Sequence, residues 1–117
     1  MLSRLFGIFR RKPLRIEGVD QLPDGMAKKV TLGDPLAGDG LDLILVHLDG
    51  QFHALDSRCP HAGGFITDGP LVEGKFVNCP LHHYKFDPKT GACDNAPCGK
   101  AKVYKTQLDG GTLSVYV

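Results

Sequence analysis

Two short stretches of this chain combine cysteine with histidine at spacings that suit metal binding. Cys59-Pro60-His61 gives the first pair, and Cys79-Pro80-Leu81-His82 gives the second after a spacer of seventeen residues. One thiolate and one imidazole from each stretch make four ligands of the kinds that hold zinc or an iron–sulfur centre. A further histidine, His83, follows His82 directly, so the sequence also asks which of the two belongs to the site.

The mixing of cysteine and histidine within each stretch separates two kinds of site. A zinc site with two cysteines and two histidines usually has both cysteines on one turn. A [2Fe–2S] centre with two histidines on one iron and two cysteines on the other needs mixed loops, because each loop then reaches both irons. Zinc and [2Fe–2S] both remain open on the residues alone, and the mixed spacing favours the second.

Short strands are expected to position both stretches. Asp49-Gly50 is a two-residue hairpin turn whose twist suits the strands on either side, and the hairpin leads to Cys59. Another strand runs directly into Cys79. No long helical period follows residue 15, so we predict an all-β fold of short antiparallel strands. The predicted strands are 43–48, 51–55, 75–78, 103–108 and 112–117, with one more within 22–34.

Length and composition limit the class of protein. The chain has 117 residues, 42% of them apolar and 23% charged, which suits one soluble domain. The sequence has no run of 18 apolar residues, so we expect no transmembrane helix. Four cysteines without a secretory signal favour a reducing compartment, which we take to be the cytoplasm, and metal binding over disulfides.

Charge is distributed unevenly along the chain. Residues 1–15 carry five of the 14 basic residues and none of the 13 acidic ones. The remaining nine basic and thirteen acidic residues give residues 16–117 a charge of −4. A nucleic-acid-binding domain would be basic, so we expect no nucleic-acid partner.

The N-terminal segment, residues 1–15, is expected to form a short amphipathic helix and a linker, separate from a domain at residues 16–117. Its apolar residues fall on one helical face and Pro13 ends the pattern. This segment either packs on its own domain, or contacts a partner or weakly a membrane surface through residues 1–12. The apolar residues are Leu2, Leu5, Phe6 and Phe9.

With these motifs the chain resembles the Rieske proteins, whose signature is Cys-x-His, a spacer of about this length, and Cys-x-x-His. The resemblance spans residues 16–117, and "CPLHHYKFDPKTG" is similar to the ferredoxin form of the second loop. It implies a Rieske-like fold with a cluster-binding subdomain of two loops and one [2Fe–2S] cluster per chain. By the same resemblance, Cys59 and Cys79 hold the inner iron, and His61 and His82 hold the outer one.

The other histidines and cysteines have no ligand role under this resemblance. His83 occupies a place where the family usually has glycine, so we expect a solvent-facing side chain in a glycine-like backbone conformation. An effect of this side chain on docking or on the response to pH is the alternative. His47 and His53 are expected to be exposed strand residues. Cys93 and Cys98 are expected to be free or partly buried thiols, with a mutual disulfide as the alternative.

The loops resemble the low-potential Rieske ferredoxins of oxygenase systems. The respiratory type has an extra cysteine in each loop, and a serine and a tyrosine that donate to the cluster. Here Leu81 holds the extra cysteine's place in the second loop, Tyr84 the serine's and Phe86 the tyrosine's. Phenylalanine donates no hydrogen bond, so a low reduction potential is expected.

This resemblance implies a soluble one-electron carrier and not an enzyme in its own right. Its partners would be a flavin-dependent reductase as donor and a terminal oxygenase as acceptor. One alternative is the small Rieske subunit of a larger reductase, such as nitrite reductase. Another is a zinc-binding structural module.

Overall fold

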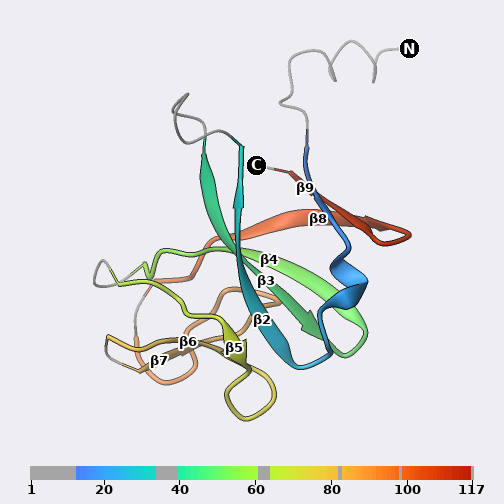
Figure 1. Cartoon of the computed structure of the whole chain (residues 1–117). Helices are drawn as coiled ribbons and strands as arrows, with labels where there is room; N and C mark the ends of the chain where they lie inside the picture. Colours follow the sequence, from blue (N-terminus) through green and yellow to red (C-terminus); the bar gives the residue numbers. More distant parts are fainter. Residues whose placement is uncertain (1–12, 34–39, 61–63, 82, 98, 117) are drawn as a thin grey trace.

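Antiparallel β-structure makes up nearly all of the regular structure. The computed structural model describes residues 13–33, 40–60, 64–81, 83–97 and 99–116 (Figure 1). One sheet has seven strands in the order β1-β9-β8-β4-β3-β2-β5, and β6 and β7 form a second, two-stranded sheet. The elements are β1 Leu14–Glu17, η1 Val19–Gln21, β2 Met26–Leu32, β3 Leu41–Leu48, β4 Gln51–Asp56, β5 Gly69–Pro70, β6 Val77–Cys79, β7 Tyr84–Phe86, β8 Val103–Asp109 and β9 Thr112–Tyr116.

The β3–β4 hairpin forms as the sequence predicts. Leu48 pairs with Gln51, so two residues make the turn. Asp49 and Gly50 have φ of 53° and 76°, which is the conformation that matches the twist of the flanking strands. The amide of Gly50 also donates to Oδ1 of Asp24 at 2.9 Å, which ties the turn to the chain before β2.

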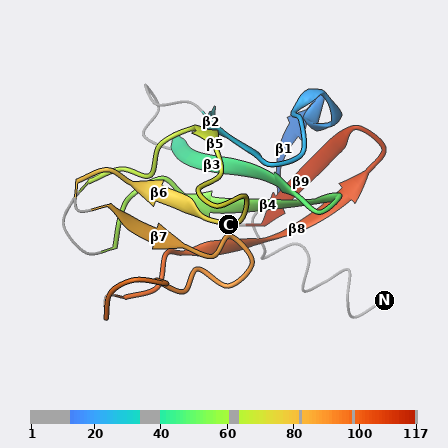
Figure 2. The ribbon, with the colours of Figure 1, turned by 90° about the horizontal axis from the view of Figure 1, so that it is seen from below.

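The central strand β3 is buried on both of its faces. Because side chains alternate along a strand, Ile44 and Val46 point to one side of the sheet, and Leu43 and Leu45 to the other. The side chains on the side of Ile44 and Val46 belong to a core that lies between the long sheet and β6–β7 (Figure 2). We call it the cluster-side core, because it holds the two cysteines predicted to bind the cluster. Its buried residues are Ala27, Ile44, Val46, Leu48, Leu55, Cys59, Ile66, Leu71, Val77, Cys79, Phe86 and Ala101.

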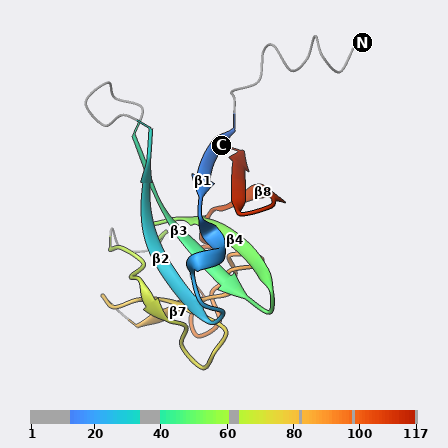
Figure 3. The same ribbon diagram turned by 45° about the vertical axis from the view of Figure 1, so that its right-hand side comes forward.

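The second core, on the side of Leu43 and Leu45, is called the inner core here and forms because the long sheet curls. β1 lies beside β2, so the two ends of the sheet approach each other, and η1 packs on β9 (Figure 3). The enclosed side chains come from β1, η1, β3, β4, β8 and β9. They are Ile16, Val19, Leu43, Leu45, Ala54, Tyr104, Leu113 and Val115.

Two details differ from the sequence prediction. Leu14 and Arg15 belong to β1 and pair with β9, where a linker was expected. β6 begins at Val77 and not at residue 75, because Val72 and Phe76 exchange backbone hydrogen bonds around a tight turn. The helix expected within residues 1–12 lies outside the described residues.

The other predicted strands are confirmed, with small shifts at their ends. β8 and β9 form the last hairpin, and β2 falls within residues 22–34. Within the described ranges the only helical segment is Val19–Gln21, so the all-β prediction is correct for them. None of the described helical structure is long and apolar enough to cross a membrane.

Candidate metal centre

The first loop, residues 57–66, is closed by a short antiparallel stem. The amide of Ile66 donates to the carbonyl of Ser57 at 2.7 Å, and the amide of Cys59 donates to the carbonyl of Gly64 at 2.8 Å. The stem leaves a four-residue tip, residues 60–63, which contains His61. Cys59 is only 5% exposed, so its thiol lies on the core side of the stem.

The second loop, residues 79–84, repeats this arrangement at the end of β6. Cys79 is the last residue of β6 and pairs with Tyr84, the first residue of β7. The tip again has four residues, 80–83, and contains His82. The side chain of Cys79 is fully buried. Each cysteine therefore ends a stem, with its predicted partner histidine in the adjoining tip.

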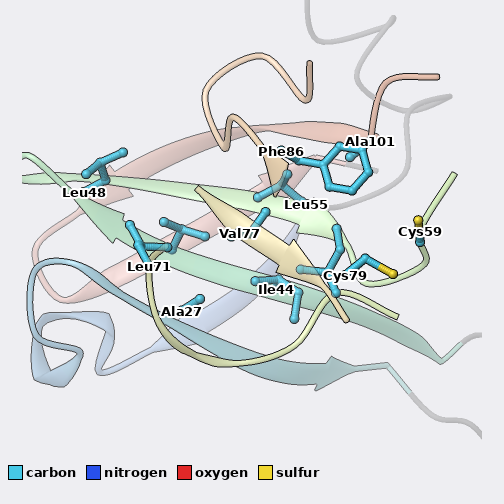
Figure 4. Packing of buried hydrophobic residues seen from close by; sticks show 12 residues of the cluster. Ala27, Ile44, Leu48, Leu55, Cys59, Leu71, Val77, Cys79, Phe86 and Ala101 are labelled. Carbon is cyan, nitrogen blue, oxygen red and sulfur yellow. The ribbon is translucent and has the colours of Figure 1, made fainter. Parts of the chain in front are cut away.

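Gly64 is the point at which the two loops meet. A Cβ atom at this position would lie 2.9 Å from Sγ of Cys79 and 3.1 Å from Cβ of Leu81. The backbone of the first loop therefore packs directly against the second cysteine. Figure 4 shows Cys59 and Cys79 at the same end of the cluster-side core. The structure thus brings the two predicted cysteine ligands together, whereas His61 and His82 lie outside the described residues.

The chemistry of this donor set fits a [2Fe–2S] cluster. Two cysteines buried among apolar side chains would need a compensating positive charge to act as thiolate ligands, and the iron ions of a cluster would provide it. At Gly64 the two loops lie so close together that no side chain fits between them. Glycine is the residue that allows a backbone to approach a bound group this closely, so its presence here fits a site that holds a cluster. Cys59 and Cys79 would hold the cluster together with His61 and His82 from the two tips.

Asn95 fixes the second loop and was not identified from the sequence. Its Nδ2 donates to the carbonyl of His83 at 2.8 Å, and its Oδ1 accepts the amide of Lys85 at 2.9 Å. His83 is exposed and has a φ of 56°, which confirms the expected glycine-like conformation. The Asn95 side chain therefore hydrogen-bonds the backbone of this loop as a neighbouring strand would, and it supports His83 in its strained conformation.

Asp56 and Arg58 form a clamp just before Cys59. Oδ1 of Asp56 accepts the Arg58 amide at 3.0 Å, and Oδ2 accepts the Arg58 guanidinium at 2.9 Å. Burial raises the pKa of Asp56, but the hydrogen bonds and charge of Arg58 outweigh it and hold this pKa below its ordinary value. The amide of Asp56 donates to the carbonyl of Lys102 at 2.8 Å. This clamp sets the direction in which the chain enters the first loop.

The turn after the second loop is tied to the segment before β8. The amide of Gly91 donates to the carbonyl of Asp87 at 2.7 Å, and its carbonyl accepts the amide of Ala101 at 2.8 Å. Gly91 has a φ of 81°, and a Cβ there would lie 2.1 Å from the carbonyl oxygen of Ala101. Only glycine fits this position, which explains the "FDPKTG" pattern. The turn supports Phe86, which is fully buried in the cluster-side core.

The prediction of exposed side chains at His47 and His53 is wrong. Nδ1 of His47 lies 2.6 Å from the carbonyl oxygen of Leu22, and its ring stacks on Phe52. Nε2 of His53 is buried and has no hydrogen-bond partner among the described residues. Burial and the charge of Lys89 lower the pKa of His53. Both side chains are partly covered, because segments from other parts of the chain pack on β3 and β4. The alternating pattern of the two strands does not reveal this packing.

Cys93 is a free, half-buried thiol, as expected. Its Sγ lies 3.7 Å from Oδ1 of Asn95, beside the second loop. Cys98 lies outside the described residues.

The fold and the paired loops define a class of protein that holds a metal centre between two cysteine-bearing hairpins. The family model of the Rieske [2Fe-2S] domain matches residues 12–112. The chain therefore belongs to the Rieske [2Fe–2S] domain family, and that family implies one [2Fe–2S] cluster per chain. The resemblance stated from the sequence is confirmed.

Relatives and solved structures narrow this family further. The chain is 35% identical over 100 residues to the 3-phenylpropionate/cinnamic acid dioxygenase ferredoxin subunit of Photorhabdus laumondii subsp. laumondii, covering 85% of this chain and 89% of that protein. The ferredoxin of carbazole 1,9a-dioxygenase from Nocardioides aromaticivorans IC177 superposes with a TM-score of 0.74 at 27% identity, covering 91% and 98% of the two chains. A structure assigned as an NADH-dependent nitrite reductase small subunit from Mycobacterium tuberculosis gives a TM-score of 0.64 at 25% identity, covering 88% and 92%.

Proposed function

We propose that this protein is a one-electron carrier that accepts electrons from a flavin-dependent reductase and delivers them to a terminal oxygenase. The supporting observation is the 35% identity to a dioxygenase ferredoxin subunit across 85% of the chain. The ferredoxin of carbazole 1,9a-dioxygenase supports the same class through its fold. In this role the protein passes electrons between partners and catalyses no substrate reaction of its own.

The residues of the two loops would divide the work of holding the cluster. We assign Cys59 and Cys79 to the buried iron, and His61 and His82 to the iron nearer the surface. The cluster supplies reversible one-electron redox chemistry when it is bound. The stems keep both thiols in the cluster-side core, where apolar side chains exclude water.

A nitrite reductase small subunit is the second candidate, and its support is the Mycobacterium tuberculosis structure. A carrier ferredoxin should purify alone and exchange partners, whereas a small subunit should remain bound to a large reductase. Purification of the intact chain from its native host distinguishes the two candidates by whether a large reductase remains bound to it. The zinc-module alternative is dropped, because the chain belongs to the Rieske [2Fe–2S] domain family.

The N-terminal segment is proposed to lie outside the domain. Because β1 begins at Leu14, we place the boundary at about residue 12, where the family match also begins. We propose a cytoplasmic location and a docking role for residues 1–12, on a partner or an anionic membrane surface. Deletion of residues 1–12 should leave the visible spectrum unchanged and weaken salt-sensitive binding to one of these surfaces.

The central test is the cofactor and its reduction. Purified protein should contain about two irons and two acid-labile sulfides per chain, as a [2Fe–2S] centre requires. An axial EPR signal should appear only after reduction. NADH with a flavin-dependent reductase of a dioxygenase system should then reduce the centre. Stoichiometric zinc without sulfide would contradict the proposal.

A further inference from the structure

The surface beside the first loop combines positive charge with exposed apolar side chains. This first-loop flank consists of Lys29, Arg58 and Phe65, together with Leu81, which belongs to the second loop where that loop meets Gly64. Phe65 is 56% and Leu81 is 53% exposed, and they are among the few large apolar residues so exposed in the described part of the chain. Leu81 packs beside Gly64, the residue next to Phe65. Exposed large apolar residues beside a functional loop are a feature of interaction sites.

The two cations of the flank are held in place. Nζ of Lys29 lies 5.7 Å from the centroid of the Phe65 ring, over its face. The Arg58 guanidinium is fixed by Asp56, yet its side chain is 73% exposed while that of Asp56 is 10% exposed. The charge that solvent and a partner meet is therefore the positive end of this pair. Arg58 and Phe65 also pair across the stem of the first loop.

The two cations differ in their carboxylate neighbours. Arg58 pairs with Asp56, whereas Lys29 forms no ion pair with any described carboxylate. Asp42 lines the shallow hollow between Arg58 and Phe65, and it accepts a hydrogen bond from the Thr31 hydroxyl at 2.6 Å. Of the two cations, Lys29 therefore carries a charge that no described carboxylate pairs, and Arg58 presents the exposed end of its pair, although residues 16–117 together carry nine basic and thirteen acidic residues, a charge of −4.

The far side of the second loop, at Lys85, has a different electrostatic character. Nζ of Lys85 lies between two carboxylates, with Glu73 in direct contact and Oδ2 of Asp94 at 3.7 Å. That cation is locally neutralised. The two sides of the cluster-bearing end are therefore electrostatically unequal.

We propose that the first-loop flank is the docking face for the electron-transfer partner, and that it selects a protein surface with carboxylates around an apolar centre. This inference rests on the proposed carrier function and adds which side of the site docks and what chemistry it recognises. Opposite charges steer the encounter and raise its rate, and a desolvated aromatic contact at the centre of an interface contributes most of the affinity. Arg58 and Lys29 would provide the steering charge. Phe65 would provide the central aromatic contact, and Leu81 would add an apolar contact beside it.

Two inorganic oxidants of opposite charge test the cationic half. Reduced holoprotein loses one electron to hexacyanoferrate(III), an anion, or to hexaammineruthenium(III), a cation, and each metal complex is reduced by that electron. Arg58→Gln and Lys29→Gln should each lower the ratio of the anion's rate constant to the cation's by roughly threefold or more at low ionic strength. High salt should remove the difference. Lys75→Gln is the matched control, because Nζ of Lys75 also lies over an aromatic ring, 5.9 Å from the centroid of Phe76.

Two polyanions test the apolar half as inhibitors of oxidation by hexaammineruthenium(III). A glutamate–tyrosine copolymer should inhibit more strongly than poly-glutamate of equal charge. Phe65→Ala should abolish this preference, while Leu108→Ala, at a residue 48% exposed on β8, should retain it. Variants are compared after their visible circular dichroism matches that of the wild type.

The outcomes separate this inference from the proposed function. If Arg58→Gln and Lys29→Gln change the rate ratio no more than Lys75→Gln, the cationic docking face is refuted while electron carrying stands. Equal inhibition of the wild type by both polymers refutes the apolar contact. If neither oxidant takes an electron from the reduced wild type, electron carrying and the docking face are both refuted.

Discussion

Gly64 offers a direct test of how the two loops meet. Alanine at this position would place a Cβ atom 2.9 Å from Sγ of Cys79 and 3.1 Å from Cβ of Leu81. Both neighbours belong to the second loop, and Cys79 is fully buried, so its thiol is surrounded by packed side chains. The two loops must therefore separate by several tenths of an ångström. We expect this movement to disturb the metal centre more than the fold.

Two other glycines provide matched comparisons. Gly25 has a φ of 86°, and a Cβ atom added there would meet nothing within 4 Å, so Gly25→Ala adds backbone strain without crowding, about 1–2 kcal/mol. Gly64 lacks a positive φ, so Gly64→Ala adds crowding alone, about 1–3 kcal/mol. Gly91 combines a φ of 81° with a Cβ position 2.1 Å from a carbonyl oxygen, so Gly91→Ala should cost about 2–5 kcal/mol.

Thermal unfolding and cluster content measured on the same samples distinguish these effects. Each 1 kcal/mol should lower the melting temperature by roughly 4–8 °C. Gly25→Ala and Gly64→Ala should lose similar stability, but only Gly64→Ala should lose iron on gel filtration and change the visible circular dichroism. If Gly64→Ala retains the iron content and visible spectrum of the wild type, the two loops do not meet as described.

Four further results follow from the site. His82→Ala should abolish the cluster and His83→Gly should retain it, which iron analysis checks; the reverse pattern would exchange the ligand assignment. Asn95→Ala should lower the melting temperature by the loss of two loop hydrogen bonds, about 1–3 kcal/mol together, and shorten the lifetime of the visible spectrum. The midpoint potential should lie below about −50 mV by voltammetry, and Phe86→Tyr should raise it by less than a ceiling of roughly 65–130 mV, provided that the hydroxyl reaches a cysteine sulfur. Folding stability should fall as pH drops below about 6.5, because unfolded His53 binds a proton that the folded protein, with its lowered pKa, resists; His53→Gln should reduce that loss.

The parts of the fold that the sequence predicts are those encoded by local chemistry. Asp49-Gly50 specifies its hairpin because both residues tolerate positive φ. The buried run of β3 is visible as consecutive apolar residues, since both faces of that strand are covered. β1 is harder to predict, because Leu14–Glu17 follows Pro13 and finds its partner β9 about one hundred residues later. Its pairing is a tertiary effect that no local pattern contains.

The candidate site divides in the same way. Cys59 and Cys79 can be proposed as ligands from the sequence, because a thiol and an imidazole must lie close together in sequence to share one hairpin. Asn95 cannot be identified in this manner, because its amide serves backbone groups ten and twelve residues earlier. His53 was misassigned because the turn that covers it, with Asp87 and Lys89, comes from a different part of the chain.

The two four-residue tips show why the motif is necessary and yet incomplete. Both tips have the same length, but the histidine is the second residue of one and the third of the other. Equal stems with unequal histidine positions mean that sequence spacing alone does not place the imidazoles. Gly64 sets how closely the first stem approaches the second, and Asn95 holds the backbone of the second tip in its strained conformation. We propose that the four ligands supply the chemistry of the centre, while Gly64 and Asn95 position the loops that would hold it.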